Sequence, residues 1–230
     1  MEKRSPALSP IEAKRGSLWM VFQYLLLPQL LMLLIGDTGF QTFCYHLICF
    51  FAVLLIFRSS LRSCLPWDLN HWKGIIRVCL LSLFAYYLTG FLIRLLVNAL
   101  APTFSNRNDE ALMQMAGSSL FLFGVTTILL APVSEELLFR GLLFGQLVKR
   151  NRCLGYLVSS LCFCLIHLVG YLGTYTPMQF FLAFLQYLLP GLILAWSCEK
   201  SRSIAAPILI HMVINGISLI SILQLCVFIG

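Results

Sequence analysis

Long apolar stretches dominate the chain, and polar residues gather in the short segments between them. A membrane-spanning helix needs about 20 predominantly apolar residues, because each residue advances the helix by ~1.5 Å across ~30 Å of hydrocarbon. Seven runs approach or exceed this length: 18–36, 40–57, 75–100, 119–149, 154–170, 178–197 and 204–227. We therefore predict an all-α fold, a polytopic transmembrane helix bundle of about seven membrane helices.

The composition agrees with this pattern. Of the 230 residues, 60% are hydrophobic and 11% are charged, whereas about a quarter of the residues of a soluble globular domain are charged. The chain is therefore expected to have the lipid bilayer as its main surroundings.

Basic residues cluster on alternate connections. They precede the first apolar run and follow the second, fourth and sixth; the group consists of Lys3, Arg4, Lys14, Arg15, Arg58, Arg62, Lys73, Arg77, Lys149, Arg150, Arg152, Lys200 and Arg202. Because cytoplasmic loops accumulate Lys and Arg, we expect a multi-pass cell-membrane protein with a cytoplasmic N-terminus. The net charge of +7 then reflects topology, and we expect no nucleic-acid partner, since such binding needs a basic face in water.

The content of the helices changes near residue 117. Residues 1–117 are predicted to form N-terminal membrane helices with few ionisable groups inside, and residues 118–227 a bundle that holds polar groups within the membrane. In the first part, His46 is expected to be an interfacial histidine with satisfied hydrogen bonds, and the segment 106–110 an ordinary connection.

The stretch APVSEELLFRG, residues 131–141, holds three charges where each one costs roughly 2.5–3.5 kcal/mol. Glu136 and Arg140 stand at i and i+4, the spacing of an ion pair on one helix face. Glu135 points about 100° away and is left without that partner, so it could accept a proton from water. Pro132 is expected to kink the helix beside it.

Two further segments carry polar residues at similar depth. FCLIH ends in His167, and HMVIN places His211 and Asn215 four residues apart on one helical face. Together with Glu135 they offer a base for water and donors for a developing oxyanion, the parts required to hydrolyse a peptide bond.

The three motifs in this order resemble the CPBP family of intramembrane endopeptidases, which includes CAAX proteases and bacteriocin-processing proteins. EELLFR fits EExxxR, FCLIH fits FxxxH, and HMVIN fits HxxxN. The resemblance implies that Glu135 activates water, that His167 helps to hold it, and that His211 and Asn215 stabilise the oxyanion. Glu136, Arg140 and Phe163 would support the site, and the catalytic cavity would open toward the cytoplasm.

The resemblance leaves the cofactor unknown, because family members are described both as zinc enzymes and as metal-independent glutamic proteases. In a zinc enzyme, Glu135, His167 and His211 would be the metal ligands, completing with water a shell of two histidines and one carboxylate. The HExxH motif is missing from the chain.

The expected function is therefore that of a CAAX-protease-like intramembrane endopeptidase, a hydrolase that cleaves a membrane-associated and in some cases lipid-modified protein or peptide, with Glu135 as general base. The compact chain favours a bacterial inner membrane. Two alternatives stay open: a non-catalytic bacteriocin-immunity or binding protein of the same fold, and a proton-coupled transporter, since buried Glu and His also form proton relays.

Overall fold

The computed structural model describes residues 8–64 and 69–229, and helices connected by turns make up these parts of the chain, with no strand among them. The predicted all-α fold is confirmed. The helices are α1 Pro10–Leu25, α2 Leu27–Leu34, α3 Thr38–Ile56, α4 Arg58–Cys64, α5 Leu69–Leu100, α6 Arg107–Ser118, α7 Leu120–Val125, η1 Thr126–Leu130, α8 Ala131–Glu136, η2 Leu137–Phe144, α9 Gly145–Leu147, α10 Arg152–Leu168, η3 Val169–Tyr171, α11 Pro177–Ser201 and α12 Ala205–Ile229.

Five helices of the described chain are long and apolar enough to cross a membrane, and a sixth span results if α1 and α2, bent by 45° at their junction, are counted together. Ala205–Ser221 of α12 is a shorter apolar helix. The seven predicted runs fall on these elements. Many large apolar side chains on the outside of the bundle are exposed, Leu33 and Phe121 among them, as lipid contact requires.

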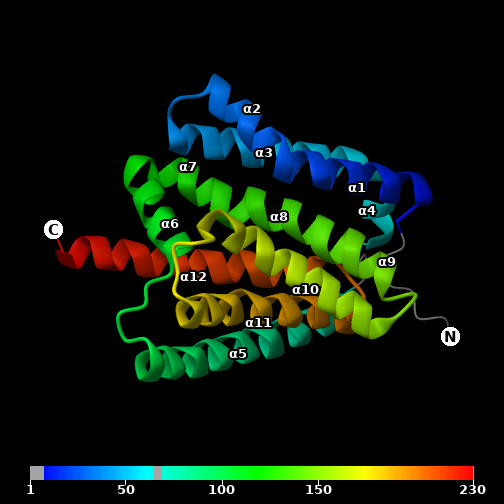
Figure 1. Cartoon of the computed structure of the whole chain (residues 1–230). Helices are drawn as coiled ribbons and strands as arrows, with labels where there is room; N and C mark the ends of the chain where they lie inside the picture. The colour runs from blue at the N-terminus through cyan, green and yellow to red at the C-terminus, as the bar shows by residue number, and fades with distance from the viewer. Residues whose placement is uncertain (1–7, 65–68, 230) are drawn as a thin grey trace.

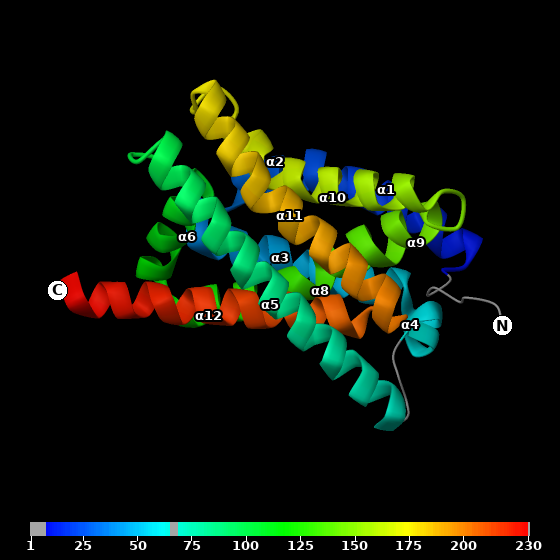
Figure 2. The same cartoon turned by 90° about the horizontal axis from the view of Figure 1, so that it is seen from below.

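A helical rod from Leu120 to Leu147, formed by α7 to α9, runs through the middle of the bundle (Figure 1). Helices α1, α2 and α3 cover one side of it, and α5, α10, α11 and α12 lie on the other (Figures 1 and 2). Helix α3 packs against α8 and α12 packs against α8 from the opposite side. Both parts of the predicted division at residue 117 therefore surround the segment that carries Glu135.

Two wide turns interrupt the regular helix of this rod. Residues Thr126–Leu130 and Leu137–Phe144 form π-helical turns, in which, for example, the amide of Ala131 donates to the carbonyl of Thr126. Pro132 directly follows the first of them. Proline lacks an amide hydrogen and clashes with the carbonyl four residues earlier, and a wider turn accommodates both effects. Such turns occur often at functional sites.

Local hydrogen bonds fasten the bundle at the end that holds the basic residues. Ser9 and Glu12 form a capping box at the start of α1. The buried Glu12 carboxylate also accepts from the Ser59 hydroxyl at 2.6 Å and from the Ser60 amide at 3.1 Å. These bonds join α1 to the corner between α3 and α4.

Candidate active site

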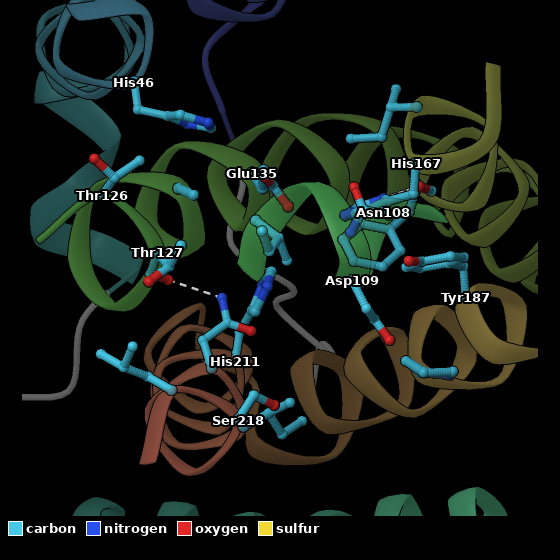
Figure 3. Close-up of a pocket in the computed structure, with 18 of the residues that line it drawn as sticks. His46, Asn108, Asp109, Thr126, Thr127, Glu135, His167, Tyr187, His211 and Ser218 are labelled. Carbon is cyan, nitrogen blue, oxygen red and sulfur yellow. Dashed lines mark hydrogen bonds between the residues drawn. The ribbon is translucent and has the colours of Figure 1, made fainter. Parts of the chain in front are cut away.

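The four predicted catalytic residues lie around one cavity of about 700 Å³. Glu135 enters it from α8, His167 from α10, and His211 and Asn215 from α12 (Figure 3). The cavity lies between the central rod and the helices on both sides of it, and α1, α3, α5, α6 and α11 complete its wall. The structure thus brings together residues that are separated by up to 80 positions in the chain.

Glu135 is half-buried and faces this cavity. Its Oε2 atom is buried, and no hydrogen-bond partner for it exists among the described residues. No salt bridge reaches this carboxylate in the same part of the chain, although His167 lies within its electrostatic reach. Glu135 is therefore an available proton acceptor beside a cavity.

Glu136 does not line the cavity and is fully buried. Its Oε1 atom accepts from Arg140 Nη1 at 2.8 Å and lies 2.9 Å from His211 Nδ1. Arg140, also fully buried, donates through Nη2 to the carbonyl of Gly191 at 3.1 Å. The predicted ion pair between Glu136 and Arg140 is confirmed, and the pair also includes a histidine that the sequence pattern did not connect with it. Glu136 Oε2 and Arg140 Nε have no partner among the described residues.

Phe163 packs between the ion pair and the cavity. Its ring centroid lies 4.4 Å from the Arg140 guanidinium carbon, 4.7 Å from the His167 ring and 5.9 Å from the His211 ring. A cation over an aromatic face is stabilised by the ring's electron density, more so away from water. Phe163 therefore supports the buried cation and fixes two histidines at once.

His167 is held from two directions. Its Nδ1 atom lies 2.8 Å from the carbonyl oxygen of Phe163, and its ring stacks on Tyr187 at 4.7 Å between centroids. A carbonyl only accepts hydrogen bonds, so the contact assigns the hydrogen to Nδ1 in the neutral ring. The Nε2 atom is then an acceptor that can receive a hydrogen from water.

His211 and Asn215 line the cavity from one face of α12, as their spacing predicts. The carboxylate of Glu136 orients the His211 ring through Nδ1, which leaves Nε2 as its second nitrogen. The Asn215 amide donates to the carbonyl of Thr127 at 2.8 Å, the dashed line of Figure 3, and keeps one further N–H for another acceptor. Thr127 belongs to the first π-helical turn, so this turn helps to position Asn215.

Known proteins with similar sequences agree with the motifs. Residues 117–217 match the model of the Rce1-like family, described as type II CAAX prenyl endopeptidase Rce1-like. The putative membrane peptidase YdiL of Bacillus subtilis is 27% identical over 178 residues, which cover 73% of this chain and 65% of that protein. Residues 117–217, which hold all three motifs, are thus similar to a family of CAAX proteases.

A second relative has a name without an activity. The UPF0177 protein YxdF of Lactococcus lactis is 27% identical over 163 residues, covering 69% of this chain and 79% of that protein. No solved structure matches the chain. The family match covers all three motifs and the whole central rod, whereas α1, α3 and α5 lie outside it.

The described side chains around the cavity are not arranged as a metal site. Among the described residues, no group of three or more His, Cys, Asp or Glu side chains is arranged to hold a metal ion. Glu135, His167 and His211 therefore share a cavity without forming the compact shell that zinc requires.

Two residues of the cavity wall were not predicted. His46 of α3 was expected to be satisfied, but its Nδ1 atom is buried and has no hydrogen-bond partner among the described residues. Asp109 of α6, in a segment taken for an ordinary connection, also lines the cavity. The Asp109 side chain is accessible from the cavity, yet the protein around it displaces enough water to raise its pKa to about 6.

The cavity extends toward the end of the bundle that holds α6 and the start of α3 (Figure 1). The helix α6 is fastened there by the Asn106 amide, which donates to Gln186 at 2.6 Å, and by the Tyr187 hydroxyl, which donates to Asn106 at 3.2 Å. The basic connections lie at the other end, near α4, α9 and the start of α12. The part of the cavity that α3 and α6 line therefore lies toward the end of the bundle opposite to the basic connections.

Proposed function

We propose that this chain is an intramembrane endopeptidase that hydrolyses a peptide bond with Glu135 as the general base. The observation that carries this proposal is the contrast between neighbouring glutamates: Glu136 is neutralised by Arg140, whereas the Glu135 carboxylate faces a cavity with one oxygen unpartnered. An ionisable group at such depth is costly, and a catalytic role explains why it is placed beside histidines. The similarity to a family of membrane peptidases supports the same reaction.

The reaction follows from the donors and acceptors around the cavity. Water donates one hydrogen to Glu135 and the other to His167 Nε2, which holds its oxygen toward the substrate carbonyl. As Glu135 takes the first proton, the oxygen attacks the carbonyl carbon and forms a tetrahedral intermediate. The C–N bond then breaks, and the proton held by Glu135 moves to the leaving amine. No bound metal is needed for any of these steps.

His211 and Asn215 are placed to stabilise the intermediate. The free N–H of Asn215 can donate to the oxyanion, and His211 can donate through Nε2 where that nitrogen carries a hydrogen. Donors fixed before the reaction stabilise a developing negative charge strongly, because they need no reorganisation.

The substrate is a peptide segment held at the membrane, with a lipid-modified segment as one form of it. The cavity volume of about 700 Å³ and its lining by both apolar and polar side chains, such as Met113, Leu219 and Ser218, suit a stretch of peptide. The long apolar helices around the cavity favour a substrate that is held at the membrane.

We further propose that the basic loops are cytoplasmic and that the cavity opens on the opposite side of a bacterial inner membrane. A membrane-impermeant maleimide should then label Thr103→Cys, at the α6 end, in intact cells. The exposed native Cys153, at the basic end, serves as the internal control and should be labelled only after lysis. The reverse pattern would show that the cavity opens to the cytoplasm.

Cleavage of a quenched peptide library by the purified protein tests the enzymatic role. Glu135→Gln should lower the rate by roughly 10²–10⁴-fold, the contribution typical of a general base, without changing the unfolding midpoint in detergent. Glu110→Gln is a matched control, because Glu110 lies outside the cavity and pairs with Arg107 on the surface. Full activity of Glu135→Gln would sink the assignment, and a chelator arm reports on metal dependence.

A further inference from the structure

The N-terminal helices contribute a histidine to the cavity. His46 lies on α3, outside the segment that matches the family, and α3 packs directly against α8. Figure 3 shows the His46 ring extending toward the space in front of Glu135. The ring is fixed by the edge-to-face contact with Tyr45, at 4.9 Å between centroids.

His46 and Glu135 each have a buried polar atom that lacks a hydrogen-bond partner in the described protein. These atoms are His46 Nδ1 and Glu135 Oε2. The two groups also interact electrostatically. A buried polar atom left unpartnered is destabilising, and most such atoms in proteins have a partner. Gln23 Oε1 and Tyr24 Oη, on the same cavity wall, also lack a partner among the described residues. Several unpartnered atoms on one cavity indicate that small polar groups are bound there in the working protein, one of them between His46 and Glu135.

We propose that His46 is a further catalytic residue, which donates a hydrogen bond from Nδ1 to the water that Glu135 activates. This inference rests on the proposed peptidase function. The water then donates to Glu135 and to His167 Nε2, accepts from His46, and keeps one lone pair for attack on the carbonyl carbon. His46 gains and loses no proton in this step; it fixes the orientation of the nucleophile.

The position of the nitrogen gives a sharp test. An asparagine side chain places its amide near the Nδ1 position of histidine, whereas glutamine places its amide near the Nε2 position. His46→Phe keeps the aromatic contact with Tyr45 and removes both nitrogens. We expect His46→Phe and His46→Gln to lower kcat on the order of 10²-fold, the typical cost of misplacing a reacting group, with KM within about twofold, whereas His46→Asn should recover most of kcat.

The same peptide cleavage assay, run with Glu135→Gln in parallel and with unfolding midpoints measured for every variant, separates the outcomes. If His46→Phe keeps the wild-type kcat while Glu135→Gln is inactive, the proposed role of His46 is overturned and that of Glu135 is not. Equal rates of His46→Asn and His46→Gln would do the same, because a purely structural histidine gives no preference for the Nδ1 position. Cleavage that does not depend on Glu135 would overturn both proposals.

Discussion

On one side of helix α8, Glu136 is enclosed by protein and shares one oxygen between Arg140 and His211; on the other side, Glu135 opens onto a cavity of about 700 Å³. The two glutamates are neighbours in the chain, and successive residues of a helix point about 100° apart. One helix thus separates a charge that holds the bundle together from a charge that is left for chemistry.

The two sides also differ in how their charges are balanced. Arg140 bonds to Glu136 and to the Gly191 carbonyl and lies over the Phe163 ring, so the ionic side links the central rod to α10 and α11. The cavity side keeps buried polar atoms without a partner among the described residues, on Glu135 and His46 and also on Gln23 and Tyr24. Violations of the usual hydrogen-bonding rules are expected at functional sites, although the described chain has others away from the cavity wall, on Trp19, Ser82 and Ser160.

Arg140→Met should break the ionic side and cause the largest effect on folding. It leaves the buried Glu136 carboxylate without its cation, and removing one partner of a buried pair costs about 3–5 kcal/mol. Denaturant titration of the detergent-solubilised protein measures the loss in the free energy of unfolding. Glu135→Gln, on the cavity side, should leave that free energy nearly unchanged.

The double variant Glu136→Leu/Arg140→Met is the control for this prediction. Replacing both members of a buried ion pair with apolar residues is often neutral or stabilising, so the double variant should be more stable than Arg140→Met alone. It should also lose activity, because His211 then lacks the carboxylate that orients it. A double variant as unstable as the single one would mean that the contacts to Gly191 and Phe163, rather than charge balance, dominate.

The sequence predicted the parts of this molecule that depend on local spacing. Apolar runs of sufficient length gave the membrane helices, and the i, i+4 spacing gave the pair of Glu136 and Arg140. The separation of Glu135 from that pair also followed from helix geometry. Each of these features is decided within a single helix, where the physical rule needs no knowledge of other helices.

Contacts between distant segments were beyond such rules. The bond of His211 to Glu136 joins residues 75 positions apart, and an isolated His46 in an apolar helix does not reveal that α3 packs on α8. The π-helical turn before Pro132 replaced the expected simple kink, because a proline pattern does not show how the backbone widens. Asp109 was overlooked since only the packing of α6 against α11 turns that connection into a cavity wall.

Asp109 and Glu110 are a second pair of neighbouring carboxylates with different surroundings. Substitutions at these two residues have the smallest expected effect on stability. Burial raises the pKa of Asp109 to about 6, whereas hydrogen bonds from Ser105 and Arg107 lower the pKa of Glu110. The folded protein therefore holds the Asp109 proton more tightly than the unfolded chain does, and this contribution to stability is present at low pH and is lost as pH rises from about 4 to 6.

The stability of Asp109→Asn relative to the wild type should accordingly increase as the pH rises from about 4 to 6. Above about pH 6 the difference between the two proteins should stay constant. Glu110→Gln should behave oppositely, since a lowered pKa stabilises the fold above the ordinary value: the variant is less stable at neutral pH, and the difference disappears in acid. Unfolding midpoints in detergent between pH 4 and 7.5 measure both trends. Parallel trends in the two variants would contradict the difference in burial, because only Asp109 lines the cavity.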